Sequence, residues 1–170
     1  MDTFEAIATK LEITEFSDKP VPAEIKRKVL EAARLSPSGV NSQHWRFILI
    51  QDKNKLKQLA DDSTTGKWVG HANFAVVVLT DPKYNFHQLD AGRVIQNMQL
   101  AAWNYYVGSR IYTGMNRELM IKHFGIPENY NIAAVVGFGF PKRKILGKKN
   151  RKELEEIAFS DYFGRALIIA

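Results

Sequence analysis

An uninterrupted apolar run near the middle of the chain constrains the fold more than any other feature. Residues 74–80 read Phe-Ala-Val-Val-Val-Leu-Thr and are followed at once by Asp81-Pro82. A short run rich in β-branched residues favours a strand over a helix, and a strand that is apolar on both faces must be covered on both faces. We therefore expect a sheet with helices on each side. Residues 133–140 predict a second buried strand.

Apolar residues at helical spacing predict the covering layers. The opening helix carries Phe4, Ile7, Ala8 and Leu11 on one face, with Asp2 or Thr3 as its N-cap. Other elements alternate without a strict strand–helix–strand rhythm, so we expect an α+β fold in a single domain, residues 1–170. The remaining helices are predicted at 22–35, 53–60, 88–105, 116–124 and 151–158, and the remaining strands at 45–51 and 109–112.

Several classes of protein are excluded by what the chain lacks. It has no cysteine, which removes disulfides, thiolate zinc sites and cysteine nucleophiles. No apolar run approaches the ~20 residues of a membrane span, and no secretory signal is visible. No hydrolase elbow, Walker motif or His-Glu-x-x-His helix occurs, and the four histidines are scattered. We expect a cytoplasmic protein without a metal site or a membrane partner.

Positive charge is concentrated in one late segment. Residues 142–152 hold seven of the 24 Lys and Arg residues, leaving 17 basic against 18 acidic residues elsewhere. This basic loop could be solvated surface, a site for a small anion, or a nucleic-acid contact. Residues 141–152 contain no aromatic side chain, so no nucleic-acid partner is predicted.

The chain ends on an apolar segment, Ala166-Leu167-Ile168-Ile169-Ala170, although a free terminus is usually polar and frayed. Two interpretations are open. The segment docks on its own core, or it lies as an edge strand on a partner subunit.

The loop between the second helix and the first strand is rich in short hydrogen-bonding side chains. It reads Ser-Pro-Ser-Gly-Val-Asn-Ser-Gln-His-Trp-Arg-Phe over residues 36–47. On composition alone it is a capping loop, although the same groups could bind a planar heterocycle. The pattern Ser-Pro-Ser-x-x-Asn-Ser-Gln-x-Trp-x-Phe resembles the nitroreductase family of FMN-dependent reductases.

Three further segments resemble that family in the same order. They are residues 10–16 after the opening helix, Asp90 with Gln96-Asn97-Met98-Gln99-Leu100-Ala101-Ala102 and Gly108, and the strand 133–139 followed by residues 151–157. The resemblance covers nearly the whole chain. It implies a three-layer α-β-α sandwich with a mostly antiparallel sheet, in a homodimer that exchanges C-terminal tails and holds two FMN sites at its interface.

The resemblance also implies an activity. Hydride would pass from NADH or NADPH through FMN to a small-molecule oxidant, such as a nitroaromatic or a quinone, with no catalytic side chain. Two alternatives are another flavin reaction on the same fold, such as reductive dehalogenation or flavin cleavage, and a non-enzymatic basic protein that binds anions or nucleic acid.

Site residues follow from the same resemblance. Lys10, with Arg151 and Lys149, would bind the FMN phosphate. Pro37, Ser38 and Gly39 would line the flavin ring from the other subunit, with Asn41 and Gln43 as polar positions of that motif. Thr113 and Gly114 would offer backbone N–H groups near flavin N5.

The sequence departs from the family pattern at four positions. Glu12 stands where Ser is usual, and Thr14 stands where Arg or Lys is usual; both changes reduce the positive charge available to a phosphate. His44 and Asn73 each replace a common proline. The excess of Lys and Arg in the basic loop can compensate for the lost charge.

Overall fold

A four-stranded antiparallel sheet forms the centre of the computed structural model, which describes residues 1–145 and 147–169. The strands are ordered β1-β2-β4-β3. Every neighbouring pair is antiparallel, as the sequence analysis expected. All residues of β2 are buried. The strand bounds are β1 (Arg46–Ile50), β2 (Phe74–Thr80), β3 (Gly108–Tyr112) and β4 (Asn131–Gly139).

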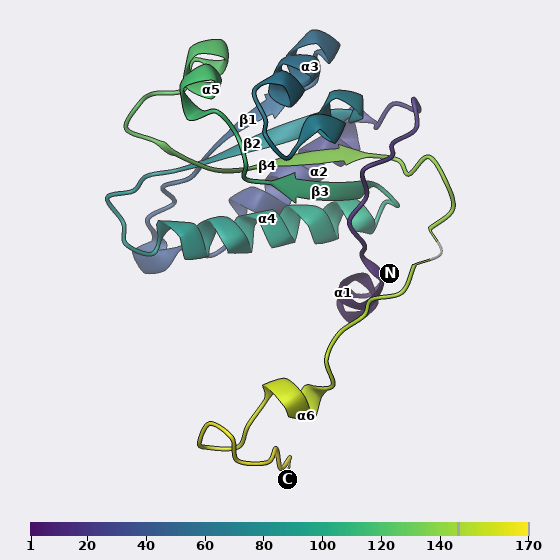
Figure 1. The fold of residues 1–170 in the computed structure, drawn as a ribbon, viewed down its shortest axis with the longest axis vertical. Coiled ribbons are helices and arrows are strands. Elements are labelled where there is room, and N and C mark those ends of the chain that lie inside the picture. Colours follow the sequence, from purple (N-terminus) through teal and green to yellow (C-terminus); the bar gives the residue numbers. More distant parts are fainter. Residues whose placement is uncertain (146, 170) are drawn as a thin grey trace.

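Helices cover both faces of the sheet, which confirms the prediction from the central apolar run (Figure 1). On one face, α2 (Ala23–Arg34) and α4 (His87–Trp103) pack with Phe74, Val76 and Val78. On the other, Ala75 and Val77 point toward the layer of α3 (Lys53–Asp61) and α5 (Arg117–Phe124). Successive residues of β2 therefore supply two separate cores, as the strand period of two requires.

The long segments match their predicted positions, and the short exposed ones do not. The helix expected over 151–158 is a single turn, α6 (Leu154–Ile157), whose residues are exposed. A short helix without tertiary packing is marginal in water. The opening helix α1 (Thr3–Thr9) is capped by Asp2 and ends before Leu11, because the backbone of Lys10 is extended. Two 3₁₀ turns, η1 (Gly39–Asn41) and η2 (Lys67–His71), complete the elements.

The tail after α6 projects away from the sheet (Figure 1). No strand forms over residues 159–169, the part of this tail that the structure describes. Phe163 is 95% exposed, and Ile168 and Ile169 are also exposed. The interpretation that the terminal segment docks on its own core is therefore wrong for residues 166–169. Residue 170 lies outside the described residues.

The cap of α5 gives a first testable prediction. The Asn116 side chain accepts a hydrogen bond from the Leu119 backbone N–H at 3.1 Å, and Gly125 ends the helix in the left-handed conformation at φ 62°. Replacing Asn116 with Ala should lower the free energy of unfolding by about 1 kcal/mol, because one helix donor loses its acceptor. Asn116→Asp, which keeps the acceptor, is the control. Equal free energies of unfolding in urea for the two variants would contradict the assignment of Asn116 as the N-cap of α5.

Candidate functional site

The predicted phosphate residues gather where α1 ends. Lys10 is 7% exposed, and its ammonium group pairs with the Glu12 carboxylate. The Lys149 ammonium donates a hydrogen bond to the backbone carbonyl of Ile7, in the last turn of α1. Residues far apart in the chain thus meet at one place. We call Lys10, Glu12, Lys149 and Arg151 the cation cluster.

The electrostatics of the cation cluster favour an anion. Burial lowers the pKa of Lys149, and the positive charges of Arg151 and Lys10 lower that pKa further, whereas Glu12 acts against them. Three cations therefore share one carboxylate, and that carboxylate already pairs with Lys10. A bound anion would relieve the repulsion among them. Thr14 lies in the same extended segment and is half-buried.

The end of α4 holds residues 9–12 in place. The indole N–H of Trp103 donates to the Thr9 hydroxyl at 2.9 Å. The Gln99 side-chain amide donates to the Ser109 hydroxyl at 3.2 Å and reaches Glu12 at 3.4 Å. Gln99 was not among the predicted site residues. Its buried position on a largely apolar helix is the feature that distinguishes it.

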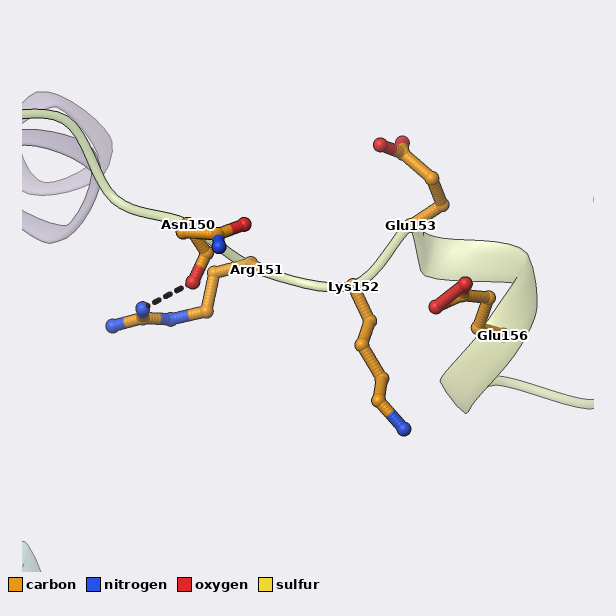
Figure 2. A pocket seen from close by; sticks show the side chains of 5 residues that line it. All are labelled: Asn150, Arg151, Lys152, Glu153 and Glu156. Carbon is orange, nitrogen blue, oxygen red and sulfur yellow. Dashed lines mark hydrogen bonds between the residues drawn. The ribbon is translucent and has the colours of Figure 1, made fainter.

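Among the described residues, the Arg151 side chain shares no hydrogen-bond partner with Lys10 or Lys149 and bonds locally instead. Its guanidinium donates to the backbone carbonyl of its neighbour Asn150 at 2.7 Å and is exposed. Figure 2 shows the side chains around it pointing in different directions. The surface depression there, of about 360 Å³, therefore offers no convergent set of donors by itself. It is lined by Asn150, Arg151, Lys152, Glu153 and Glu156.

The 36–44 loop, predicted to line a flavin ring, has an exposed tip and an anchored underside. Pro37, Asn41 and Gln43 are exposed, while Ser38 and Gly39 are half-buried. The Ser38 hydroxyl accepts a hydrogen bond from the Gln43 backbone N–H at 3.0 Å. The Gln43 amide also reaches Asn41. The loop is thus tied across its own tip.

The backbone of this loop is strained. Val40, Asn41 and Gln43 all have φ between 46° and 52°, a left-handed region that is unusual for residues other than glycine. Val40 is β-branched and 87% exposed, so its own packing does not stabilise that conformation. Strained backbone of this kind concentrates at ligand sites. The Ser42 hydroxyl is also buried without a hydrogen-bond partner among the described residues.

Thr113 and Gly114 form a third location, directly after β3. The Gly114 carbonyl accepts hydrogen bonds from the backbone N–H groups of Thr64, at 2.9 Å, and Thr65, at 3.4 Å. A Cβ on Gly114 would lie 2.5 Å from the Thr64 hydroxyl. Glycine therefore lets the two segments approach closely.

The two main groups of predicted residues both contact α4. The 36–44 loop bonds to Asp90 in its first turn, and the cation cluster lies by Trp103 at its last residue. Between these positions, the Asn97 amide donates to the Ser36 hydroxyl at 2.8 Å and the Gln99 amide reaches Glu12 at 3.4 Å. Among the described residues, no group of three metal-binding side chains occurs, and no helix is long and apolar enough to cross a membrane.

Comparison with known proteins identifies the family. The sequence model described as "Nitroreductase family" matches residues 13–66 and 60–140, which is more than half of the chain. The chain belongs to the nitroreductase family. The matched ranges contain the 36–44 loop and all of α4.

Relatives and solved structures of the nitroreductase family agree with this assignment. A protein of Archaeoglobus fulgidus, named as an NADH dehydrogenase/NAD(P)H nitroreductase, is 33% identical over 83% of this chain and 86% of its own length. A protein of the same name from Methanothermobacter thermautotrophicus is 31% identical over 83% of this chain and 78% of its own. A Desulfovibrio desulfuricans nitroreductase, solved in complex with FMN, has a TM-score of 0.85 at 26% identity, covering 96% of this chain and 98% of its own. The predicted fold is thereby confirmed.

Proposed function

We propose that this protein is an FMN-dependent oxidoreductase that uses NADH or NADPH to reduce a small-molecule acceptor such as a nitroaromatic or a quinone. The observation that carries the proposal is the cation cluster. Burial and two neighbouring cations lower the pKa of Lys149, in a chain whose relatives include NAD(P)H nitroreductases. The FMN complex of a structural neighbour supports the choice of flavin.

The residues present fit the phosphate end of FMN. A phosphate dianion is bound most strongly by several cations that are already held in place. Lys10 and Lys149 are held by Glu12 and by the Ile7 carbonyl. Arg151 donates to the carbonyl of its own backbone neighbour, and its exposed guanidinium can turn toward the phosphate. Glu12 is the unfavourable member of the cluster, since its negative charge faces the same place.

The residues present also fit the flavin ring. The 36–44 loop offers small and polar groups at an exposed tip, and Val40, Asn41 and Gln43 in it have left-handed backbone conformations. Backbone N–H groups of Thr113 and Gly114 are proposed to face flavin N5. Thr113 is exposed and Gly114 is half-buried.

We propose that two copies of the chain complete each site. The resemblance to the family assigns the phosphate contacts of each flavin to one subunit and its ring contacts to the other, so a single flavin would bind the cation cluster of one chain and the 36–44 loop of its partner. The contact surface between the two subunits would consist of exposed apolar side chains: Phe4, Ile7, Tyr162, Phe163, Ile168 and Ile169. Exposed apolar clusters of this kind mark interaction sites.

When bound, FMN supplies the redox chemistry by accepting hydride from the nicotinamide and passing electrons to the acceptor. The chain's own part is to bind and to orient. Lys10, Lys149 and Arg151 hold the phosphate, and the 36–44 loop sets the position of the ring. No side chain of the predicted site is assigned a proton-transfer role.

The proposal is tested by asking whether the purified protein retains a flavin and which one. We expect a yellow protein that releases FMN, not FAD, on heating. Flavin-free protein should take up added FMN with quenching of the flavin fluorescence. A protein that stays colourless in excess FMN would overturn the proposal. Nucleic-acid binding that weakens steeply with salt would then favour the non-enzymatic alternative.

Glu12 provides a second test of the phosphate site. Replacing Glu12 with Ser should tighten FMN binding roughly two- to fivefold, because a partly exposed carboxylate next to the phosphate is removed. Riboflavin, which has no phosphate, should not respond. Glu15→Ser is the matched control, since Glu15 pairs with Arg143 at 3.5 Å instead. Weaker FMN binding by the Glu12 variant would mean that this carboxylate is needed to hold Lys10.

A further inference from the structure

A buried histidine–aspartate pair lies beneath the 36–44 loop. The His44 and Asp90 side chains are each 1% exposed, with Nε2 of His44 3.2 Å from Oδ2 of Asp90. The same Oδ2 accepts the backbone N–H of Gly39 at 3.0 Å. The other oxygen, Oδ1, accepts from Arg93 at 3.2 Å. One carboxylate therefore joins α4 to the loop.

The second ring nitrogen of His44 determines what the first one does. Nδ1 of His44 accepts the backbone N–H of Asp81 at 3.4 Å. A nitrogen that accepts carries no proton, so the proton of the neutral imidazole is on Nε2 and is donated to Asp90. His44 thus bridges the turn after β2 and the first turn of α4. It also directs a fixed donor at the oxygen that binds Gly39.

Packing holds the ring in that orientation. The imidazole stacks on Tyr84 with ring centroids 5.2 Å apart and lies 6.2 Å from Phe86. A Cβ on Gly39 would lie 2.5 Å from the Phe86 ring. The loop backbone therefore rests directly on the aromatic group that surrounds His44.

The strained part of the loop follows Gly39 immediately. Left-handed conformations at Val40, Asn41 and Gln43 persist only where the surrounding contacts specify them. The Gly39 N–H bond to Asp90 is the contact that enters this stretch from α4. If the Asp90 carboxylate turned so that both oxygens faced Arg93, the Gly39 hydrogen bond would be lost. Residues 40–43 could then leave their left-handed conformations.

We propose that His44 is a positioning residue that acts through Asp90 to fix the backbone of residues 38–43 for flavin binding. This inference rests on the proposed function, since the loop is assigned to the flavin ring. His44 touches no flavin atom in this account. Its contribution is a hydrogen-bond donor and an acceptor held on one rigid ring.

Three substitutions separate hydrogen bonding from packing. His44→Gln keeps a donor for Asp90 and an acceptor for Asp81 but loses the ring. His44→Phe keeps the ring and loses both hydrogen bonds. His44→Asn keeps an amide that is too short to span both partners, and it replaces the phenylalanine variant if that variant does not fold. His87→Phe is the matched control, because His87 bonds to the Thr80 hydroxyl at 2.9 Å and not to the loop.

The readouts are the FMN dissociation constant and, in flavin-free protein, amide hydrogen exchange at Gly39. We expect the Phe and Asn variants to raise the dissociation constant about tenfold or more and to speed Gly39 exchange by a similar factor, as loss of a buried charged hydrogen bond implies. The Gln variant should stay within about threefold of the parent, and the control within about twofold. In the parent, the His44 ¹⁵N spectrum should show a proton on Nε2.

Two results would overturn this inference while the proposed function stands. One is that the parent binds FMN and all His44 variants bind it with the same dissociation constant as the parent. The other is a phenylalanine variant that binds like the parent while the glutamine variant does not, because the ring packing would then be what matters. A parent that binds no FMN overturns the proposed function, and the flavin-binding role of His44 with it.

Discussion

Replacing Arg151 with Ala is expected to weaken FMN binding by about 1.5–3 kcal/mol, or roughly 10- to 150-fold in Kd. A guanidinium that meets a phosphate makes charge-assisted hydrogen bonds, which are the strong ones. Within residues 1–145 and 147–169, the Arg151 side chain bonds only to the Asn150 carbonyl, so it keeps most of its donors for a ligand. Riboflavin binding should hardly change, because riboflavin carries no phosphate.

Lys152→Ala is the matched control for the Arg151 variant. Lys152 is the next residue and carries the same charge, and its side chain points in a different direction from Arg151 (Figure 2). It is also not among the charges that shift the pKa of Lys149. Both flavins are titrated into both variants. Equal losses for FMN and riboflavin, or equal losses in the two variants, would mean that the basic loop does not bind the phosphate.

Deleting residues 163–170 is expected to dissociate the dimer and to release the flavin. Phe163, Ile168 and Ile169 are exposed in the single chain, and burying three such side chains contributes roughly 5–9 kcal/mol per subunit before the cost of association. Because each proposed site takes residues from two subunits, loss of the dimer separates the cation cluster from the 36–44 loop. Folding stability should fall as well.

Sedimentation equilibrium at micromolar concentration measures this effect. The parent should have about twice the chain mass of 19.4 kDa, and the truncated chain should have the mass of one subunit. Phe4→Ser should weaken the dimer as well, because Phe4 is 79% exposed and belongs to the same proposed contact surface. A parent that sediments as one subunit with FMN present would contradict the proposed dimer.

The sheet and its helices could be predicted because their signals are local and periodic. Residues 74–80 specify a doubly covered strand by composition alone, and the structure buries all of them. Asn116 and Gly125 mark both ends of α5 by their own conformational preferences. The helix at 151–158 could not be delimited in this way, because its apolar residues Leu154 and Ile157 are exposed and tertiary packing does not fix its length.

The candidate site was predictable only in part. The resemblance to the family indicated the 36–44 loop and the basic residues. Sequence patterns do not show which residues distant in the chain contact each other. Gly39 bonds to Asp90, 51 residues away, and Lys149 bonds to Ile7, 142 residues away. The left-handed backbone at Val40 could not be predicted either, since a β-branched residue favours an extended backbone. His44 was noted as a departure from the family pattern, and its partners appeared only in three dimensions.

Anaerobic mixing of the FMN-loaded protein with NADH or NADPH tests the central claim most directly. The account predicts that the flavin absorbance near 450 nm (a general property of oxidised flavins) bleaches with one of the two nicotinamides, and that adding a quinone or a nitroaromatic restores it. The same cycle should be lost when FMN is removed and regained when it is returned. Bound FMN that neither nicotinamide reduces would contradict the proposed oxidoreductase.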